Sequence, residues 1–229
     1  MKKTVVALLL AAAFAPTLAM AEAGDIVVRV RVANVNPDED SKLGSQSAKV
    51  GLGAVLGAGS ALAVDSNTIP EVDFSYYITK NIAAELILAV GTRHDVSITK
   101  NGLGALGNQN LGSVNLLPPT LTAQWHFLPD QTVDPYVGAG VNYTRSMDNS
   151  LATSKVVPGL QIRTERNMFG PAIQAGVDVN LKDGWMINAD VKKVWISTDV
   201  KVNAGAGYVK IDSLDLDPWV FGLGVGKRF

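Results

Sequence analysis

The sequence predicts an all-β fold, an eight-stranded antiparallel transmembrane outer-membrane β-barrel with short periplasmic turns and longer extracellular loops. An export leader stands at the N-terminus, and no later stretch holds the roughly 20 apolar residues that a membrane-spanning helix needs. Segments of about ten residues repeatedly alternate apolar with small or polar side chains, as barrel strands do. If the mature chain sits in a membrane, it must therefore cross with strands.

The leader has the three parts of a secretory signal. Lys2 and Lys3 precede an apolar run from Val5 to Phe14, and Ala19-Met20-Ala21 is a small-x-small cleavage site. We expect residues 1–21 to be removed and residues 22–229 to form a single barrel domain in the bacterial outer membrane.

The first four expected strands occupy residues 25–32, 71–78, 82–90 and 120–127. Apolar residues alternate with arginines in the first strand and with acidic residues in the second and third, while the fourth alternates them with threonines, Gln124 and His126. Residues 79–81 form a short turn, and residues 128–134 form the turn after the fourth strand.

The last four expected strands occupy residues 137–144, 172–181, 185–192 and 219–229. Each carries valine, leucine, isoleucine or aromatic residues on one face and glycine, amide or charged residues on the other. Residues 180–184 make a tight hairpin between the sixth and seventh strands. The terminal Phe229 ends an amphipathic strand, which is typical of the assembly signal that outer-membrane proteins present to their insertion machinery.

Alternation alone is compatible with two kinds of barrel. A membrane barrel turns its apolar face outward to lipid, whereas a soluble lipocalin-like barrel turns its apolar face inward. Glycines and charged residues share one face in strand after strand, as a narrow polar lumen requires. Aromatic residues fall near strand ends, where the interfacial girdles of a membrane barrel lie. These are Tyr76, Trp125, Phe127, Tyr143, Trp185, Trp219 and Phe229. The membrane barrel is therefore the preferred interpretation.

Composition narrows the function classes. The 20 basic residues nearly balance the 21 acidic ones without a long run of either, which argues against a nucleic-acid partner. The chain has no cysteine and only two histidines without metal-ligand spacing, so we expect no disulfide, metal or cofactor.

Several segments together resemble the outer membrane protein W family, which includes relatives of the alkane-uptake type. They are Asn81-Ile82-Ala83-Ala84-Glu85-Leu86, His94-Asp95, Leu117-Pro118-Pro119-Thr120-Leu121, residues 135–143, Asn188-Ala189-Asp190-Val191 and Asp217-Pro218-Trp219-Val220. The resemblance spans the mature chain. It implies a barrel with a hydrophobic channel open to the outside, from which small apolar molecules leave sideways into the membrane. The apolar loop at residues 50–59 departs from the family pattern and puts ligand preference in doubt.

The predicted inward face carries enough opposite charges to fill the narrow lumen of an eight-stranded barrel. The simplest interpretation is that these residues fill the lumen; the functional interpretation is a polar plug that blocks straight passage of apolar molecules. The predicted plug residues are Arg29, Arg31, Glu71, Asp73, Glu85, His126, Asp178, Asp190, Lys192 and Arg228.

Two other sets of residues are candidates for a solute route. Apolar residues in the long loops predict a ligand-binding funnel, or alternatively a self-packed lid. They are Leu52, Val55, Leu56, Leu62, Leu103, Leu106, Leu111, Leu116 and Leu117. Prolines, which cannot donate to a strand ladder, are candidates for a lateral exit or mere strand ends. They are Pro70, Pro118, Pro119 and Pro171.

The sequence therefore predicts a monomeric, non-enzymatic channel for passive uptake of small hydrophobic molecules. Expected partners are the bilayer, lipopolysaccharide, the solutes and the insertion machinery. A structural or receptor barrel whose loops bind other molecules is the alternative. A membrane-embedded acyl hydrolase or transferase is disfavoured, because no serine is placed as a nucleophile for His94 or His126.

Overall fold

The structure is a computed structural model that describes residues 21–51, 53, 57, 59–90, 92–99, 109–148, 150–152, 161–203 and 207–229. Except for Ala21, the predicted leader lies outside these residues. Among the described residues, no helix is long and apolar enough to cross a membrane.

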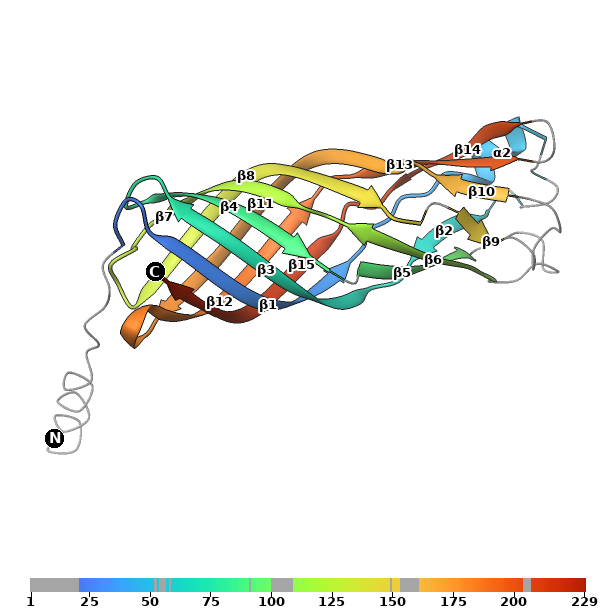
Figure 1. Cartoon of the computed structure of the whole chain (residues 1–229). Coiled ribbons are helices and arrows are strands. Elements are labelled where there is room, and N and C mark those ends of the chain that lie inside the picture. The colour runs from blue at the N-terminus through green and yellow to red at the C-terminus, as the bar shows by residue number, and fades with distance from the viewer. Residues whose placement is uncertain are drawn as a thin grey trace, which may run out of the picture.

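Eight long strands close into one antiparallel barrel, which confirms the predicted fold class (Figure 1). They are β1 (Ile26–Asn36), β3 (Asn67–Tyr77), β4 (Ile82–Ala89), β7 (Thr120–His126), β8 (Val133–Ser146), β11 (Asn167–Asn180), β12 (Trp185–Val194) and β15 (Trp219–Arg228). The order around the wall is β1-β3-β4-β7-β8-β11-β12-β15, and β15 returns to β1 from Val27↔Arg228 to Asn36↔Trp219. Because every strand is paired on both sides, the barrel has no open sheet edge.

Beyond the long-loop end of the barrel, the chain forms an extension that the sequence did not predict as separate elements (Figure 1). Three strands continue the barrel sheet: β2 (Ala61–Val64), β5 (Thr92–Thr99) and β6 (Gln109–Leu117). Four others form a second sheet: β9 (Ser150–Ala152), β10 (Gln161–Thr164), β13 (Ser197–Asn203) and β14 (Tyr208–Asp215). A short helix, α2 (Leu43–Lys49), packs on β14 and β2.

The short turns lie at the other end, near the C-terminus (Figure 1). The predicted hairpin at residues 180–184 contains the 3₁₀ turn η1 (Lys182–Gly184), where Asp183 and Gly184 have φ of 57° and 77°. Aspartate and glycine tolerate this left-handed conformation better than most residues, so the local sequence suits the reversal between β11 and β12.

The two faces of the wall follow the predicted alternation. Val32 and Leu223 point outward and are 61% and 62% exposed, whereas Arg29 and Arg31 point inward and are at most 1% exposed. Glycines of β15 make room for the arginines: a Cβ on Gly226 would lie 2.7 Å from the Arg29 Cγ. Glycines and charged residues share the inward face because a long charged side chain lies across the neighbouring strand, where a glycine leaves room for it.

Candidate functional site

The inward-facing side chains change chemistry along the barrel axis. On β1 they run from Val27 at the short-turn end, through Arg29 and Arg31, to Ala33 and Val35 at the long-loop end. The neighbouring strand β3 follows the same order, from Tyr77 through Asp73 and Glu71 to Ile69. The lumen therefore has a charged middle layer with an apolar layer above it.

Arg29 is the centre of the charged layer. Its Nε and Nη2 donate to the two carboxylate oxygens of Asp178 at 3.2 and 2.6 Å, and its Nη1 donates to Asp73 at 3.2 Å and to the Ser75 hydroxyl at 2.7 Å. All four side chains are fully or almost fully buried. Such a fork of charge-assisted hydrogen bonds is what a buried guanidinium requires.

Arg31 and Lys192 continue the network toward the long-loop end. The Arg31 Nε donates to Glu71 Oε1 at 2.7 Å, and Lys192 Nζ donates to that same oxygen at 3.1 Å. Lys192 also contacts Asp190 at 2.5 Å, while Arg31 Nη2 lies 2.8 Å from Asp73 Oδ2. These pairs join β1, β3 and β12 across the lumen.

Uncharged polar residues complete the plug and were not named as site residues from the sequence. Gln174 donates to Glu85 at 2.7 Å, and Thr122 donates to it at 3.1 Å. The Tyr136 hydroxyl donates to Asp190 at 3.1 Å and accepts from Asn188 at 3.0 Å. Thr122, Gln174 and Asn188 belong to inward rows that the alternation had already identified, so their position was the available signal. Tyr136 lies in β8 just before the predicted strand at residues 137–144.

His126 and Arg228 lie nearer the short-turn end than the other predicted plug residues. His126 Nδ1 is 2.7 Å from Asp134 Oδ2, and its ring lies against Tyr77 with centroids 5.0 Å apart. The Arg228 guanidinium lies over the same Tyr77 ring, and its Nε is 3.9 Å from Asp25. They extend the polar network of the lumen toward the short-turn end.

Oxygen and nitrogen atoms of His126, Asp134 and Asp178 all lie within 4.8 Å of one another, which is compatible in distance with a metal site. The carboxylate oxygens of this cluster are already engaged in hydrogen bonds, however. Arg29 holds both Asp178 oxygens, while His126 and the Leu128 N–H hold the two oxygens of Asp134. Hydrogen bonding accounts for this cluster without a metal ion.

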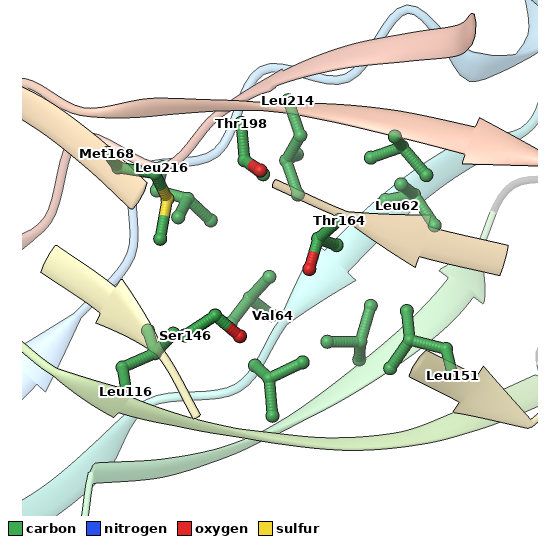
Figure 2. Close-up of a pocket in the computed structure, with 13 residues that line it drawn as sticks. Leu62, Val64, Leu116, Ser146, Leu151, Thr164, Met168, Thr198, Leu214 and Leu216 are labelled. Carbon is green, nitrogen blue, oxygen red and sulfur yellow. The ribbon is translucent and has the colours of Figure 1, made fainter. Parts of the chain in front are cut away.

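An apolar cavity lies in the extension, lined by side chains from both sheets (Figure 2). Its lining residues are Leu62, Val64, Val96, Val114, Leu116, Ser146, Leu151, Thr164, Met168, Thr198, Val200, Leu214 and Leu216. The Ser146 hydroxyl donates to the Asp148 carbonyl at 2.5 Å, so it is engaged outside the cavity. With a volume of about 30 Å³, this upper cavity has room for roughly one water.

A second cavity of about 70 Å³ lies between the upper cavity and the plug. Its walls are mostly apolar and include Val35, Ile69, Ile87, Ala89 and Val194, while Glu71 and Lys192 of the plug also line it. Leu116 lines both cavities, so it separates one from the other. We call this space the lower cavity.

The predicted loop residues divide into three groups. Leu62 and Leu116 line the upper cavity, and Leu111 is buried in the same apolar core. Leu117 is 39% exposed and lines neither cavity. Leu52, Val55, Leu56, Leu103 and Leu106 lie outside the described residues.

The four predicted prolines occupy different settings. Pro70 lies inside the β1–β3 ladder, and Pro171 lies inside the β8–β11 ladder, with its carbonyl accepting from Trp195 N at 3.0 Å. Pro118 and Pro119 separate β6 from β7, and only Pro118 among the four lines the lower cavity. The structure therefore singles out the Pro118-Pro119 pair.

The strand ladder is interrupted beside these two prolines. The β4–β7 ladder ends at Ile87↔Thr120, and the next pair along the same seam is Thr92↔Leu116, between β5 and β6. Within the described residues, no ladder pair joins 88–90 to 117–119. Proline has no N–H to donate, and the Pro119 carbonyl accepts from Tyr143 N on β8, so the two prolines supply no N–H to the side of the wall that faces β4.

A closed antiparallel barrel with an exposed apolar outer face and a sealed polar lumen defines an integral outer-membrane β-barrel protein. Residues 22–229 match the model of the OmpW family, and the chain belongs to that family. Outer membrane protein W of Salmonella typhi is 38% identical over 231 residues, covering 100% of both chains. The outer-membrane location agrees with that relative's name.

Two further comparisons extend this similarity. The crystal structure of the outer membrane protein OprG from Pseudomonas aeruginosa matches with a TM-score of 0.76 at 28% identity, covering 91% of this chain and 97% of that one. The dibenzothiophene metabolism operon protein PahQ, also from Pseudomonas aeruginosa, is 30% identical over 184 residues, 80% of this chain and 82% of the relative.

Proposed function

We propose that this protein is a channel for passive uptake of small hydrophobic molecules across the outer membrane. The solute passes from the upper to the lower cavity and leaves sideways through the interrupted ladder, above the plug. The observation that carries the proposal is the position of the lower cavity, which touches the plug at Glu71 and Lys192 and the interruption at Pro118.

The change in lumen chemistry supports a sideways route. An apolar solute gains from contact with apolar walls by about 25 cal/mol per Å² removed from water. Going further down would require it to displace hydrogen bonds within a buried charged network, where unpaired groups are costly. Lipid outside the wall offers an apolar path without that cost.

Passage also requires side chains to move. The two cavities measure about 30 and 70 Å³, far below the roughly 300 Å³ of a typical small-molecule pocket. Leu116, which borders both cavities, is the side chain whose rotation most directly connects them. PahQ gives independent support, because its name ties a relative to the metabolism of an apolar aromatic compound.

The test compares uptake of n-octane and of arabinose by cells that differ only in this protein. Faster octane uptake with unchanged arabinose uptake is expected, because the plug excludes a polar solute. Faster arabinose uptake would contradict the plug, and a hydrolysed or acyl-transferred product would indicate an enzyme. Unchanged uptake of both would favour a structural or receptor barrel.

A further inference from the structure

We propose that His94 makes the lower cavity selective for apolar molecules that carry one hydrogen-bond donor, such as long-chain alcohols and phenols. This inference rests on the proposed function and names the preferred solute class for the same route. The observation behind it is a buried imidazole that lines an otherwise apolar cavity with one nitrogen uncommitted.

The first step concerns the tautomer of His94. The side chain lies on β5, is 3% exposed and lines the lower cavity. Its Nδ1 is 2.8 Å from the backbone carbonyl of Asp65, and a carbonyl oxygen only accepts, so Nδ1 carries the hydrogen. In the neutral ring, Nε2 is then an acceptor, and no hydrogen bond to it is found in the described part of the chain.

The second step concerns the uncharged polar groups of the cavity, whose donors are already used; the cationic Lys192 at its floor donates to Glu71 and Asp190. The Thr92 hydroxyl donates to the Leu116 carbonyl, and the Thr144 hydroxyl donates to Asn142 Oδ1 at 2.7 Å. The Asn142 amide donates to Thr120 Oγ1 at 2.8 Å, and that hydroxyl donates to the Pro118 carbonyl at 3.3 Å. A solute that brings only acceptors finds none of these donors free.

The third step concerns charge beneath the cavity. The ion pairs of the plug join three cationic side chains, Arg29, Arg31 and Lys192, to five carboxylates, Glu71, Asp73, Glu85, Asp178 and Asp190. An excess of carboxylates disfavours an anionic head group at the cavity floor. The free hydrogen-bonding capacity and the charge thus favour a neutral donor over an ether, an ester or a carboxylate.

The binding test uses two isomers of equal size, 1-octanol and methyl heptyl ether, added to the full chain in lipid nanodiscs. The chain has two histidines, so ¹⁵N spectra of the imidazoles resolve His94 with His126 as an internal reference. We expect 1-octanol to shift the His94 Nε2 resonance while the ether leaves it in place. Equal shifts with both isomers, or no shift with either, would overturn the proposal.

The uptake test uses His94→Phe, which keeps a ring but removes the acceptor. Wild-type protein should favour the alcohol by about fivefold, the effect of one net hydrogen bond, and the variant should lose this preference. Thr99→Val on the same strand is the matched control and should keep the preference, because the Thr99 hydroxyl donates to the Ala61 carbonyl and the residue lines neither cavity.

The two proposals fail in different ways. If neither isomer enters cells with the wild-type protein faster than cells without it, the channel function fails. If both isomers enter faster, but the preference for the alcohol is the same in wild type and in His94→Phe, the channel function stands and the proposed selectivity is wrong. Heat-modifiable gel mobility of each variant verifies that the barrel has assembled.

Discussion

At the scale of single residues, Arg29 explains how a membrane barrel can hold so many charges. Its guanidinium contacts Asp73, Asp178 and Ser75, and its alkyl chain passes close to Gly226 on the next strand. The pairing offsets the loss of hydration, and the glycine supplies the space. The inward position of these charged side chains was predictable because charge and glycine share a face, but their partners across the barrel depend on strand order.

Replacing Arg29 by leucine should destabilise the barrel by about 3–5 kcal/mol, because it leaves buried carboxylates without their cation. Urea unfolding of the protein in lipid vesicles, followed by tryptophan fluorescence, measures this loss. Ser75→Ala removes one hydrogen bond from the same guanidinium and should cost only about 1 kcal/mol. A stable Arg29→Leu barrel would mean that the pairing is not needed to hold the lumen together.

At the scale of elements, the sequence predicted the eight barrel strands and missed the strands of the extension. Alternation of apolar and polar residues continues in β13, where Thr198, Val200 and Val202 are buried between exposed or half-buried neighbours. The sense is reversed there, because water surrounds the extension and its apolar side chains face inward. Strands of only a few residues, with apolar side chains that face inward, are hard to distinguish from loops in the sequence. The alternation in β13 is long enough to predict a strand.

The candidate site was predictable only in part for the same reason. Leu62 and Leu116 come together in the upper cavity, but adjacent positions in a strand face opposite sides, so Leu117 points away. The assignment of all loop leucines to one funnel ignored this alternation. His94 was not predicted as a cavity residue, because its burial beside the lower cavity depends on the β5–β6 hairpin.

The interrupted seam between β4–β5 and β6–β7 leads to a prediction about the exit. Changing Pro118 and Pro119 to alanine restores an N–H at each position beside the interruption and should let the ladder close, which lowers octane uptake while the barrel still assembles. Pro171→Ala is the matched control, because the β8–β11 ladder already runs past Pro171 to Asn167. Octane uptake that is equal in the double variant and the wild type would rule out this seam as the route.

At the scale of the whole molecule, two environments meet in one continuous set of strands. The barrel presents apolar side chains outward and charges inward, whereas the extension presents polar side chains outward and an apolar core inward. The surroundings of each half explain this inversion: hydrocarbon around the barrel and water around the extension. The apolar core of the extension meets the mostly apolar upper layer of the lumen at Leu116, which lines both cavities.

The same inversion predicts that valine-to-arginine substitution destabilises the barrel half and is tolerated in the extension. Val30 and Val209 are both exposed valines on strands, at 54% and 48%, but Val30 lies midway along β1 and Val209 lies on β14 of the extension. Val30→Arg should weaken folding into lipid vesicles by about 2–4 kcal/mol, because the charge meets hydrocarbon, whereas Val209→Arg should leave folding unchanged. Urea titration of both variants in the same vesicles measures the difference, and equal tolerance at the two sites would mean that lipid does not surround the β1 row.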